Sequence, residues 1–333
     1  MATPANPQAT VEVAGQPEVT VVIPTRDRWP LLARALGCAL GQRGVSVEVV
    51  VIDDGSKDET PARLAERAGE KRLRVVRNEH SCGVAAARNA GITMARGAWV
   101  AFLDDDDLWA PEKLRLQLAV AVATEASFVY ARAVEVDEHL RPLATMYSPD
   151  PETLPRRLLA GNVLPTPSAV AARTNLVRRV GGFDEQLRVC ADWDLWLRLS
   201  QAGTGAECSQ VLTAYVRHAT SMLTTEAERV RPEFEHMRDK HAPAARAAGV
   251  EFGNLWLDRW NATLDLTAGR RWAAARGYLR AAWTNRDLGS LAHAIGVSLG
   301  PRAHARMRAL KSRRTEVPVW LTSYAEGNTV PAP

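Results

Sequence analysis

Cysteine is scarce in this chain, with four residues among 333 and no C-x-x-C spacing. The sequence therefore indicates neither a disulfide scaffold nor a zinc ribbon. It also lacks any run of 18 apolar residues, so no transmembrane helix is expected. Residues 1–17 have no basic start and no apolar core, and they are expected to be a disordered leader rather than a secretory signal. A cytoplasmic, reducing location is the default expectation.

The whole chain has little excess of one charge, because 42 Lys and Arg stand against 38 Asp and Glu. A nucleic-acid partner is therefore not expected. Residues 270–314 differ from this average, since they hold eleven Lys and Arg and a single acid, Asp287. That segment has a net charge of +10, which leaves −6 for the rest of the chain.

Two interpretations of this basic segment remain open. It is either a solvated helical appendage or a peripheral contact with the anionic inner face of the plasma membrane. At such a surface each Lys or Arg contributes about 1 kcal/mol to the binding free energy. Trp272, Leu279 and Trp283 fall near one face of a predicted helix in this segment. Such spacing suits interfacial binding and core packing equally.

Apolar strands alternate with helical stretches over the first part of the chain. Strands are predicted at residues 19–24, 45–53, 72–77 and 98–103, and helices at 29–40, 60–68, 84–96 and 111–124. Continuous apolar strands with helices between them are typical of a mostly parallel sheet covered on both faces. The sequence therefore predicts an α/β, Rossmann-like fold with helices on both sides of a mixed, mostly parallel sheet.

The alternation changes after residue 126. We expect strands at 128–136 and 211–218, a loop at 142–151, a Pro-broken strand at 165–172, and helices at 155–160 and 192–202. The remainder is predicted to be helical, at 226–248, 251–267, 270–284, 287–299 and 302–314. These patterns divide the chain into a main domain over 18–225, a helical C-terminal extension over 226–324 and a frayed tail over 325–333.

Polar and acidic side chains follow each of the first four predicted strands. Ligands of open parallel sheets bind beyond the carboxyl ends of the strands, so these residues should meet at one edge. The acidic run 104–107 follows the fourth strand, and Asp53 and Asp54 follow the second. Neighbouring carboxylates repel one another unless a positive group lies among them, and their oxygens suit Mg²⁺ or Mn²⁺. The structural alternative is an acidic turn that caps the helix near Pro111.

Several enzyme classes are disfavoured because their motifs are missing. The first strand is followed by neither a Walker A sequence nor G-x-G-x-x-G, and the chain has no G-x-S-x-G elbow. A P-loop ATPase, a dinucleotide dehydrogenase and an α/β-hydrolase are therefore not indicated. The zinc-deaminase residue set is also missing.

The motifs that are present resemble, in their order, those of the glycosyltransferase family 2 enzymes, which have the GT-A fold. They read V-V-I-P-T-R-D-R (21–28), V-I-D-D-G-S-K-D-E-T (51–60), N-E-H-S-C-G-V-A-A-A-R-N-A-G-I (78–92), A-F-L-D-D-D-D-L-W-A-P-E-K-L (101–114), T-P-S (166–168), G-G-F-D-E (181–185) and A-D-W-D-L-W-L-R-L (191–199). The resemblance covers about residues 18–225 and implies an inverting, metal-dependent transfer of a hexosyl or N-acetylhexosaminyl group from a nucleotide diphosphate sugar.

The resemblance also implies roles for individual residues. The residues expected to bind the nucleotide sugar are Pro24, Thr25, Arg28, Asp54, Arg88, Asp104 and Asp105. Among these, Asp54 is expected to meet the base, and Arg88 either supports the nucleotide or only pairs with an acid of the run 104–107. Asp106, as the third residue of the D-x-D motif, is expected to bind Mn²⁺ or Mg²⁺. His218 either joins it at the metal or is purely structural.

Asp192 aligns with the catalytic base of the family. It opens a predicted helix rich in Trp, where burial raises a carboxyl pKa toward the working range. The Glu that usually precedes this Asp is replaced by Ala191. Asp194 is the nearest competitor, but two residues further along a helix it should face away. The structural alternative is that Asp192 is only the N-cap of the helix.

The acceptor is less defined than the donor. The sequence has no Q-x-x-R-W signature and no membrane span, which favours the addition of a single sugar to a glycan, lipid-linked or small-molecule acceptor. Two alternatives remain, a nucleotidyltransferase and a non-catalytic protein that binds sugar nucleotides. A nucleotidyltransferase would be indicated by a Gly-rich signature after the first strand. A non-catalytic protein would be indicated by loss of the D-x-D motif or of the base. Neither feature is found.

Overall fold

The computed structural model describes residues 16–218, 229–286, 288–300 and 317–325. Its strands form one nine-stranded sheet in the order β3-β2-β1-β4-β8-β6-β9-β5, with β7 paired to β6. Six strands run in one direction: β1 (Val19–Thr25), β2 (Val47–Asp53), β3 (Leu73–Arg77), β4 (Trp99–Phe102), β6 (Phe128–Val136) and β9 (Gly205–Val216). The opposite direction is taken by β5 (Leu108–Trp109), β7 (Pro142–Met146) and β8 (Val170–Arg173). The mixed, mostly parallel sheet predicted from the sequence is confirmed.

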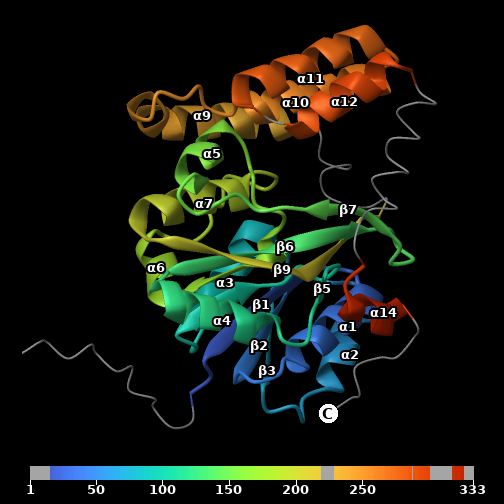
Figure 1. Cartoon of the computed structure of the whole chain (residues 1–333). Coiled ribbons are helices and arrows are strands. Elements are labelled where there is room, and N and C mark those ends of the chain that lie inside the picture. The colour runs from blue at the N-terminus through green and yellow to red at the C-terminus, as the bar shows by residue number, and fades with distance from the viewer. Residues whose placement is uncertain (1–15, 219–228, 287, 301–316, 326–333) are drawn as a thin grey trace, which may run out of the picture.

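Helices cover both faces of the sheet (Figure 1). One face packs on α1 (Trp29–Leu40), α2 (Thr60–Ala65), α4 (Lys113–Thr124) and α14 (Val319–Ala325). The other packs on α3 (Val84–Met94), α5 (Leu154–Ala160), α6 (Thr174–Arg179), α7 (Ala191–Ala202) and α9 (Val230–Ala247). Each face of the sheet has its own hydrophobic core, and alternate residues of β1 point into them. Val21 packs in the core on the α1 side, and Val22 packs in the core on the α3 side. Both faces of the strand are thus buried, as its continuous apolar sequence requires.

Three further helices follow α9: α10 (Asn254–Thr267), α11 (Arg271–Asn285) and α12 (Leu288–Ser298). They lie together at one end of the molecule (Figure 1). An aromatic stack joins them to the sheet core, because Trp193 of α7 stacks on Phe252 and Trp256 of α10 stacks on Phe234 of α9. Among the described residues, no helix is long and apolar enough to cross a membrane.

Several predicted elements differ from the observed ones. The expected loop at 142–151 is wrong, because β7 pairs antiparallel with β6 there. The expected strand at 165–172 is wrong at its start, where residues 167–169 form a 3₁₀ turn before β8. Three short elements were not predicted, namely β5, α6 and α14. The predicted helix at 302–314, most of the leader and almost all of the frayed tail lie outside the described residues.

Candidate active site

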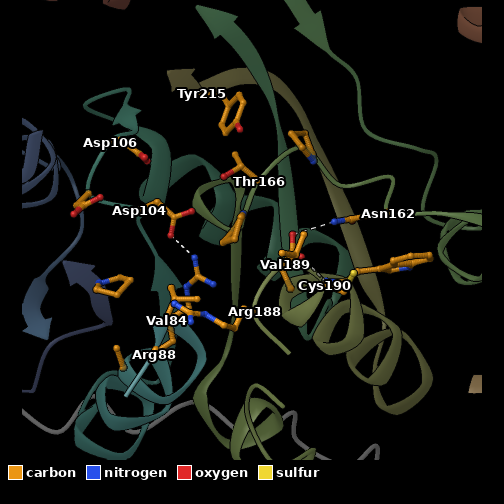
Figure 2. A pocket seen from close by; sticks show the side chains of 18 of the residues that line it. Val84, Arg88, Asp104, Asp106, Asn162, Thr166, Arg188, Val189, Cys190 and Tyr215 are labelled. Atoms are coloured by element: carbon orange, nitrogen blue, oxygen red, sulfur yellow. Dashed lines mark hydrogen bonds and ion pairs between the residues drawn. The ribbon is translucent and has the colours of Figure 1, made fainter. Parts of the chain in front are cut away.

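A cavity of about 610 Å³ lies at the carboxyl ends of the parallel strands. The register places the last residues of β1 and β2, Thr25 and Asp53, side by side, so the loops that follow both strands open at the same edge. The opposite wall comes from the loop after α5 and the start of α7 (Figure 2), and α10 also contributes residues to the lining. The cavity is lined by all the predicted donor-binding residues and by Asp106 and Asp192. His218 is adjacent, in contact with Asp106.

Each carboxylate of the acidic run has its own partners. Asp104 pairs with Arg88, and Asp105 accepts a hydrogen bond of 2.7 Å from Thr25 Oγ1. Arg28 contacts both Asp105 and Asp106, at 3.3 and 3.2 Å. The interpretation of this run as a helix cap is wrong, because α4 begins at Lys113, and its N-cap residue, Glu112, makes no side-chain capping bond.

Burial changes the protonation of this turn. It raises the pKa of Asp105 to about 7, with the neighbouring charge of Asp106 acting in the same direction. Burial also raises the pKa of Asp107 well above the ordinary range, although Thr166 Oγ1 donates a hydrogen bond of 3.0 Å to it. Desolvation of the charged form explains both shifts. The turn therefore carries less negative charge than four isolated Asp residues would.

Asp106 and His218 converge on one point at the cavity. Asp106 Oδ2 lies 2.8 Å from His218 Nε2, and both side chains are largely buried. No group of three potential metal ligands is found among the described residues, so this part of the protein offers a carboxylate and an imidazole. Mg²⁺ and Mn²⁺ prefer oxygen ligands such as the Asp106 carboxylate, and they complete their shell with phosphate oxygens and water. The donor set fits the expected ion.

Asp54 organises the loop that leads into α3. It accepts hydrogen bonds from Asn78 Nδ2, Ser81 Oγ and the backbone N–H groups of Cys82 and Gly83, at 2.7–2.9 Å. Burial acts to raise its pKa, but these four bonds outweigh it and the pKa is lowered. Because a carboxylate has about four lone-pair positions, all of them are occupied. The contact of Asp54 with a base stays a prediction.

Asp192 is the second residue of α7 and faces the cavity. Its Oδ2 accepts a hydrogen bond of 3.0 Å from Asn162 Nδ2, and its Oδ1 accepts one of 2.7 Å from the N–H of Trp193. Burial raises its pKa, against these bonds and the charge of Arg88. The N-cap interpretation is wrong, because the N-cap residue is Cys190.

Asp194 lies outside the cavity lining and is fully buried. It is surrounded by three basic side chains, with Arg198 Nε at 2.8 Å, Lys240 Nζ at 2.9 Å and His241 Nε2 at 2.8 Å. Although burial opposes ionisation, these partners hold its pKa well below the ordinary range. Asp194 is therefore an ionised structural group that joins α7 to α9.

The position before Asp192 is taken by Ala191, a buried residue that offers no carboxylate. A carboxylate reaches the start of α7 from another element. Glu233 Oε2 of α9 accepts hydrogen bonds from the N–H groups of Val189 and Cys190, at 2.8 and 3.0 Å. An anion at a helix N-terminus satisfies free N–H groups and is favoured by the helix dipole.

Comparison with known proteins identifies the family. The model of the family described as Glycosyl transferase family 2 matches residues 20–185, about half of the chain. Residues 20–185 belong to glycosyl transferase family 2. This span includes the acidic run and the other residues predicted to bind the donor, while Asp192 and His218 lie beyond it.

Relatives of the family 2 domain are named as glycosyltransferases or polysaccharide biosynthesis proteins. The succinoglycan biosynthesis protein ExoO of Rhizobium meliloti is 34% identical over 64% of this chain. The match spans 63% of that relative, slightly less than two thirds of its length. WfgD of Escherichia coli is named as a UDP-Glc:alpha-D-GlcNAc-diphosphoundecaprenol beta-1,3-glucosyltransferase. It is 31% identical over 34% of this chain and 44% of its own length.

Two solved structures share the fold. TarS 1–349 of S. aureus in complex with UDP-GlcNAc matches with a TM-score of 0.54 and 17% identity, over 93% of this chain and 92% of that chain. The mannosyltransferase PcManGT of Pyrobaculum calidifontis, in complex with GDP-Man and Mn²⁺, matches with a TM-score of 0.52 and 21% identity, over 95% and 88%. The expected GT-A fold is confirmed.

Sequence reasoning missed several residues that line the cavity, on more than one of its sides. They are Met146, Asn162, Thr166, Arg188, Tyr215, Trp256 and Arg259. Thr166 stands in the T-P-S motif, but no role had been inferred for it. Asn162 had no signal, because it touches Asp192 only after α5 and α7 pack together. In Figure 2, Asn162 lies across the cavity from Asp104 and Arg88.

Proposed function

We propose that this protein transfers one sugar, with inversion, from a nucleotide diphosphate sugar to an acceptor hydroxyl. The observation that carries the proposal is the position of Asp192 on the opposite wall of one cavity from the turn 104–106. A donor held between them would have its diphosphate beside Arg28 and Arg88 and its sugar facing Asp192. Binding in this way fixes the geometry of in-line attack.

The proposed step transfers a glycosyl group. The acceptor hydroxyl gives its proton to a carboxylate oxygen of Asp192, while its oxygen forms a bond to C1 of the sugar. The bond between C1 and the diphosphate oxygen breaks, and its electron pair leaves with the nucleoside diphosphate. A raised pKa suits a base that must take up a proton, and Asn162 holds the carboxylate in place.

Asp106 and His218 would hold Mn²⁺ or Mg²⁺, which supplies positive charge against the leaving diphosphate when bound. Arg28 contacts Asp105 and Asp106, so its guanidinium would also lie beside the oxygens of the leaving diphosphate. Arg88 pairs with Asp104 at the back of the cavity. These two cations and the ion share one task, the neutralisation of the leaving group.

We further propose a lipid-linked saccharide as the acceptor. Arg188 and Arg259 line the cavity that also holds Asp192, and guanidinium groups suit the phosphates of such an acceptor. The name of WfgD describes a lipid-linked acceptor for that relative. ExoO and WfgD also favour a role in polysaccharide biosynthesis.

The first experiment identifies the donor and then tests the base. A thermal-shift panel of UDP-, GDP- and dTDP-sugars, with and without Mn²⁺, selects the donor for a hydrolysis assay in which water replaces the acceptor. Asp192→Asn should lower kcat by about 10²–10⁴ while donor affinity stays the same. The variant should fold, because the free Oδ1 of Asn162 can turn to accept a bond from the new amide.

Asp150→Asn is the matched control, since it removes one carboxylate that is exposed and outside the cavity lining. It should turn over donor at the normal rate. If Asp192→Asn does the same, Asp192 is not the base. Asp194→Asn is unsuitable as a control because Asp194 is a buried ion-pair centre.

The role of the ion is tested by calorimetry with the selected nucleoside diphosphate. Binding in Mn²⁺ should be tighter than binding in EDTA, and Asp106→Ala should remove that difference. The thermal midpoint of the variant reports whether it is folded. Equal affinity in Mn²⁺ and EDTA would remove the ion from the proposal.

A further inference from the structure

The helices α10, α11 and α12 form a layer in which α11 packs between the other two. Gly277 of α11 approaches Ala262 of α10, and Tyr278 of α11 stacks on His293 of α12. The buried side of α11 is made of Ala274, Tyr278 and Ala281. Figure 1 places this layer at the end of the molecule farthest from α14.

The opposite side of α11 is apolar but exposed. Trp272, Leu279 and Trp283 are 57, 46 and 90% exposed. Spacings of seven and four residues place them on one helix face, roughly opposite Tyr278 and Ala281. These side chains are therefore not core residues. Core packing, one of the two interpretations that their spacing allowed, is wrong for them.

The neighbouring helix α12 repeats this arrangement. Leu288, Leu291 and Ile295 are 78, 38 and 47% exposed and fall on one face, while Ala294 and Val297 are buried. Adjacent helices thus present apolar stripes to solvent. We call the six exposed residues of α11 and α12 the outer face. Monomeric soluble proteins rarely expose large apolar patches unless they bind something, so each stripe is a candidate contact surface.

Positive charge accompanies the outer face. Arg276 lies between Trp272 and Leu279 on the same stripe, and Arg271 stacks on the Trp272 ring at 4.5 Å. Arg286 is exposed at the end of α11.

We propose that the outer face docks on an anionic lipid membrane. Trp and Leu side chains enter the boundary between headgroups and acyl chains, while Arg side chains contact lipid phosphates. A second copy of the chain is a poorer occupant, since a two-fold interface would bring Arg276 and Arg271 of both copies onto the same basic surface. The layer of α10, α11 and α12 also adjoins the cavity, because α10 contributes Trp256 and Arg259 to the cavity lining.

The test is sedimentation of the full chain with vesicles of phosphatidylcholine alone or with 30% phosphatidylglycerol, at low and high salt. The protein should bind the anionic vesicles at low salt and lose binding as salt rises. Trp283→Ser and Arg276→Glu should each weaken this binding at least about tenfold. Both positions are exposed, so the variants should retain the wild-type melting temperature and rate of donor hydrolysis.

Val122→Ser is the matched control, because Val122 is an apolar residue of α4 that is 78% exposed. It should bind vesicles as the wild type does. The proposal is overturned if the wild type ignores anionic vesicles, if it binds neutral vesicles equally well, or if Trp283→Ser instead converts a dimer to a monomer in analytical ultracentrifugation. None of these results bears on sugar transfer, which the hydrolysis assay reports separately.

Discussion

Asp192 and Asp194 are two residues apart, yet their surroundings move their pKa values in opposite directions. Asp192 is buried beside a neutral amide, so its charged form is disfavoured. Asp194 is buried among three basic groups, so its charged form is held. This contrast is typical of sites where one carboxylate exchanges protons and another is structural.

The first prediction concerns the pH dependence of donor hydrolysis. A base works in its deprotonated form, so activity should fall as pH drops through the pKa of Asp192, which is raised above its ordinary range. Asn162→Ala removes a hydrogen bond to the carboxylate and should move this acid limb to higher pH. Profiles of kcat/KM for both proteins measure the shift. An unchanged or lowered limb would contradict the assignment.

The second prediction concerns Asp194. Its folded-state pKa is lowered, so its contribution to stability is present above the unfolded pKa of about 4 and is lost as pH falls below it. Asp194→Asn removes the one buried carboxylate that Arg198, Lys240 and His241 share, and it should lower the free energy of unfolding by about 3 kcal/mol at pH 7. Urea denaturation at pH 7 and pH 3 should show the difference shrinking at acid pH. A constant difference would argue against an ionised Asp194.

Sequence reasoning brought together the residues that follow parallel strands, because the topology alone places those loops at one edge. It also placed Asp194 away from the cavity, from helix geometry alone. It could not find Asn162 or Glu233, whose contacts to α7 depend on how α5 and α9 pack. Nor could it foresee that four donors from one loop would fill the lone pairs of Asp54.

At the scale of elements, α7 depends on a carboxylate from α9, although α9 was assigned to the C-terminal extension. Glu233→Ala would leave the N–H groups of Val189 and Cys190 without their acceptor and should cost about 1–2 kcal/mol. Urea unfolding measures this loss. Glu235→Ala is the control, because Glu235 is exposed on the same helix. Equal stability of the two variants would contradict the capping role.

Long, apolar elements were predicted well, and short ones were not. The helix at residues 29–40 and the strand at 128–136 were predicted with the observed bounds. By contrast, β7 is half-buried throughout and pairs with only one strand, so it has no continuous apolar run. It also contains a Pro, and its sequence is therefore typical of a loop. The seven residues of α14 are too few to show a helical period.

At the scale of the whole molecule, the chain returns to the sheet after the helical layer. In α14, Leu321 is fully buried in the core on the α1 side, and Trp320 Nε1 donates a hydrogen bond of 2.9 Å to the carbonyl of Val211. Point variants therefore test the outer face better than a deletion of residues 269–333, which would also remove this packing.

The last stability prediction follows from that return. Leu321→Ala should lower the free energy of unfolding by about 2–5 kcal/mol, since it removes a buried side chain from the main core. Val319→Ala, at a position 86% exposed on the same helix, should change it little. Thermal and urea unfolding compare the two. Similar behaviour of both variants would mean that α14 does not contribute to the core.

The exposed loop held by Asp54 gives the molecule a selective chemical handle. Cys38, Cys190 and Cys208 are buried, and burial raises the pKa of each thiol, which makes all three poor nucleophiles. Cys82 is exposed, and its N–H donates to Asp54, which lines the cavity. A fluorescent maleimide should therefore label Cys82 selectively among the four thiols, and a bound nucleotide should slow the labelling. Mass spectrometry identifies the modified residue, and the labelling rates with and without nucleotide then measure occupancy of the cavity without a radioactive substrate.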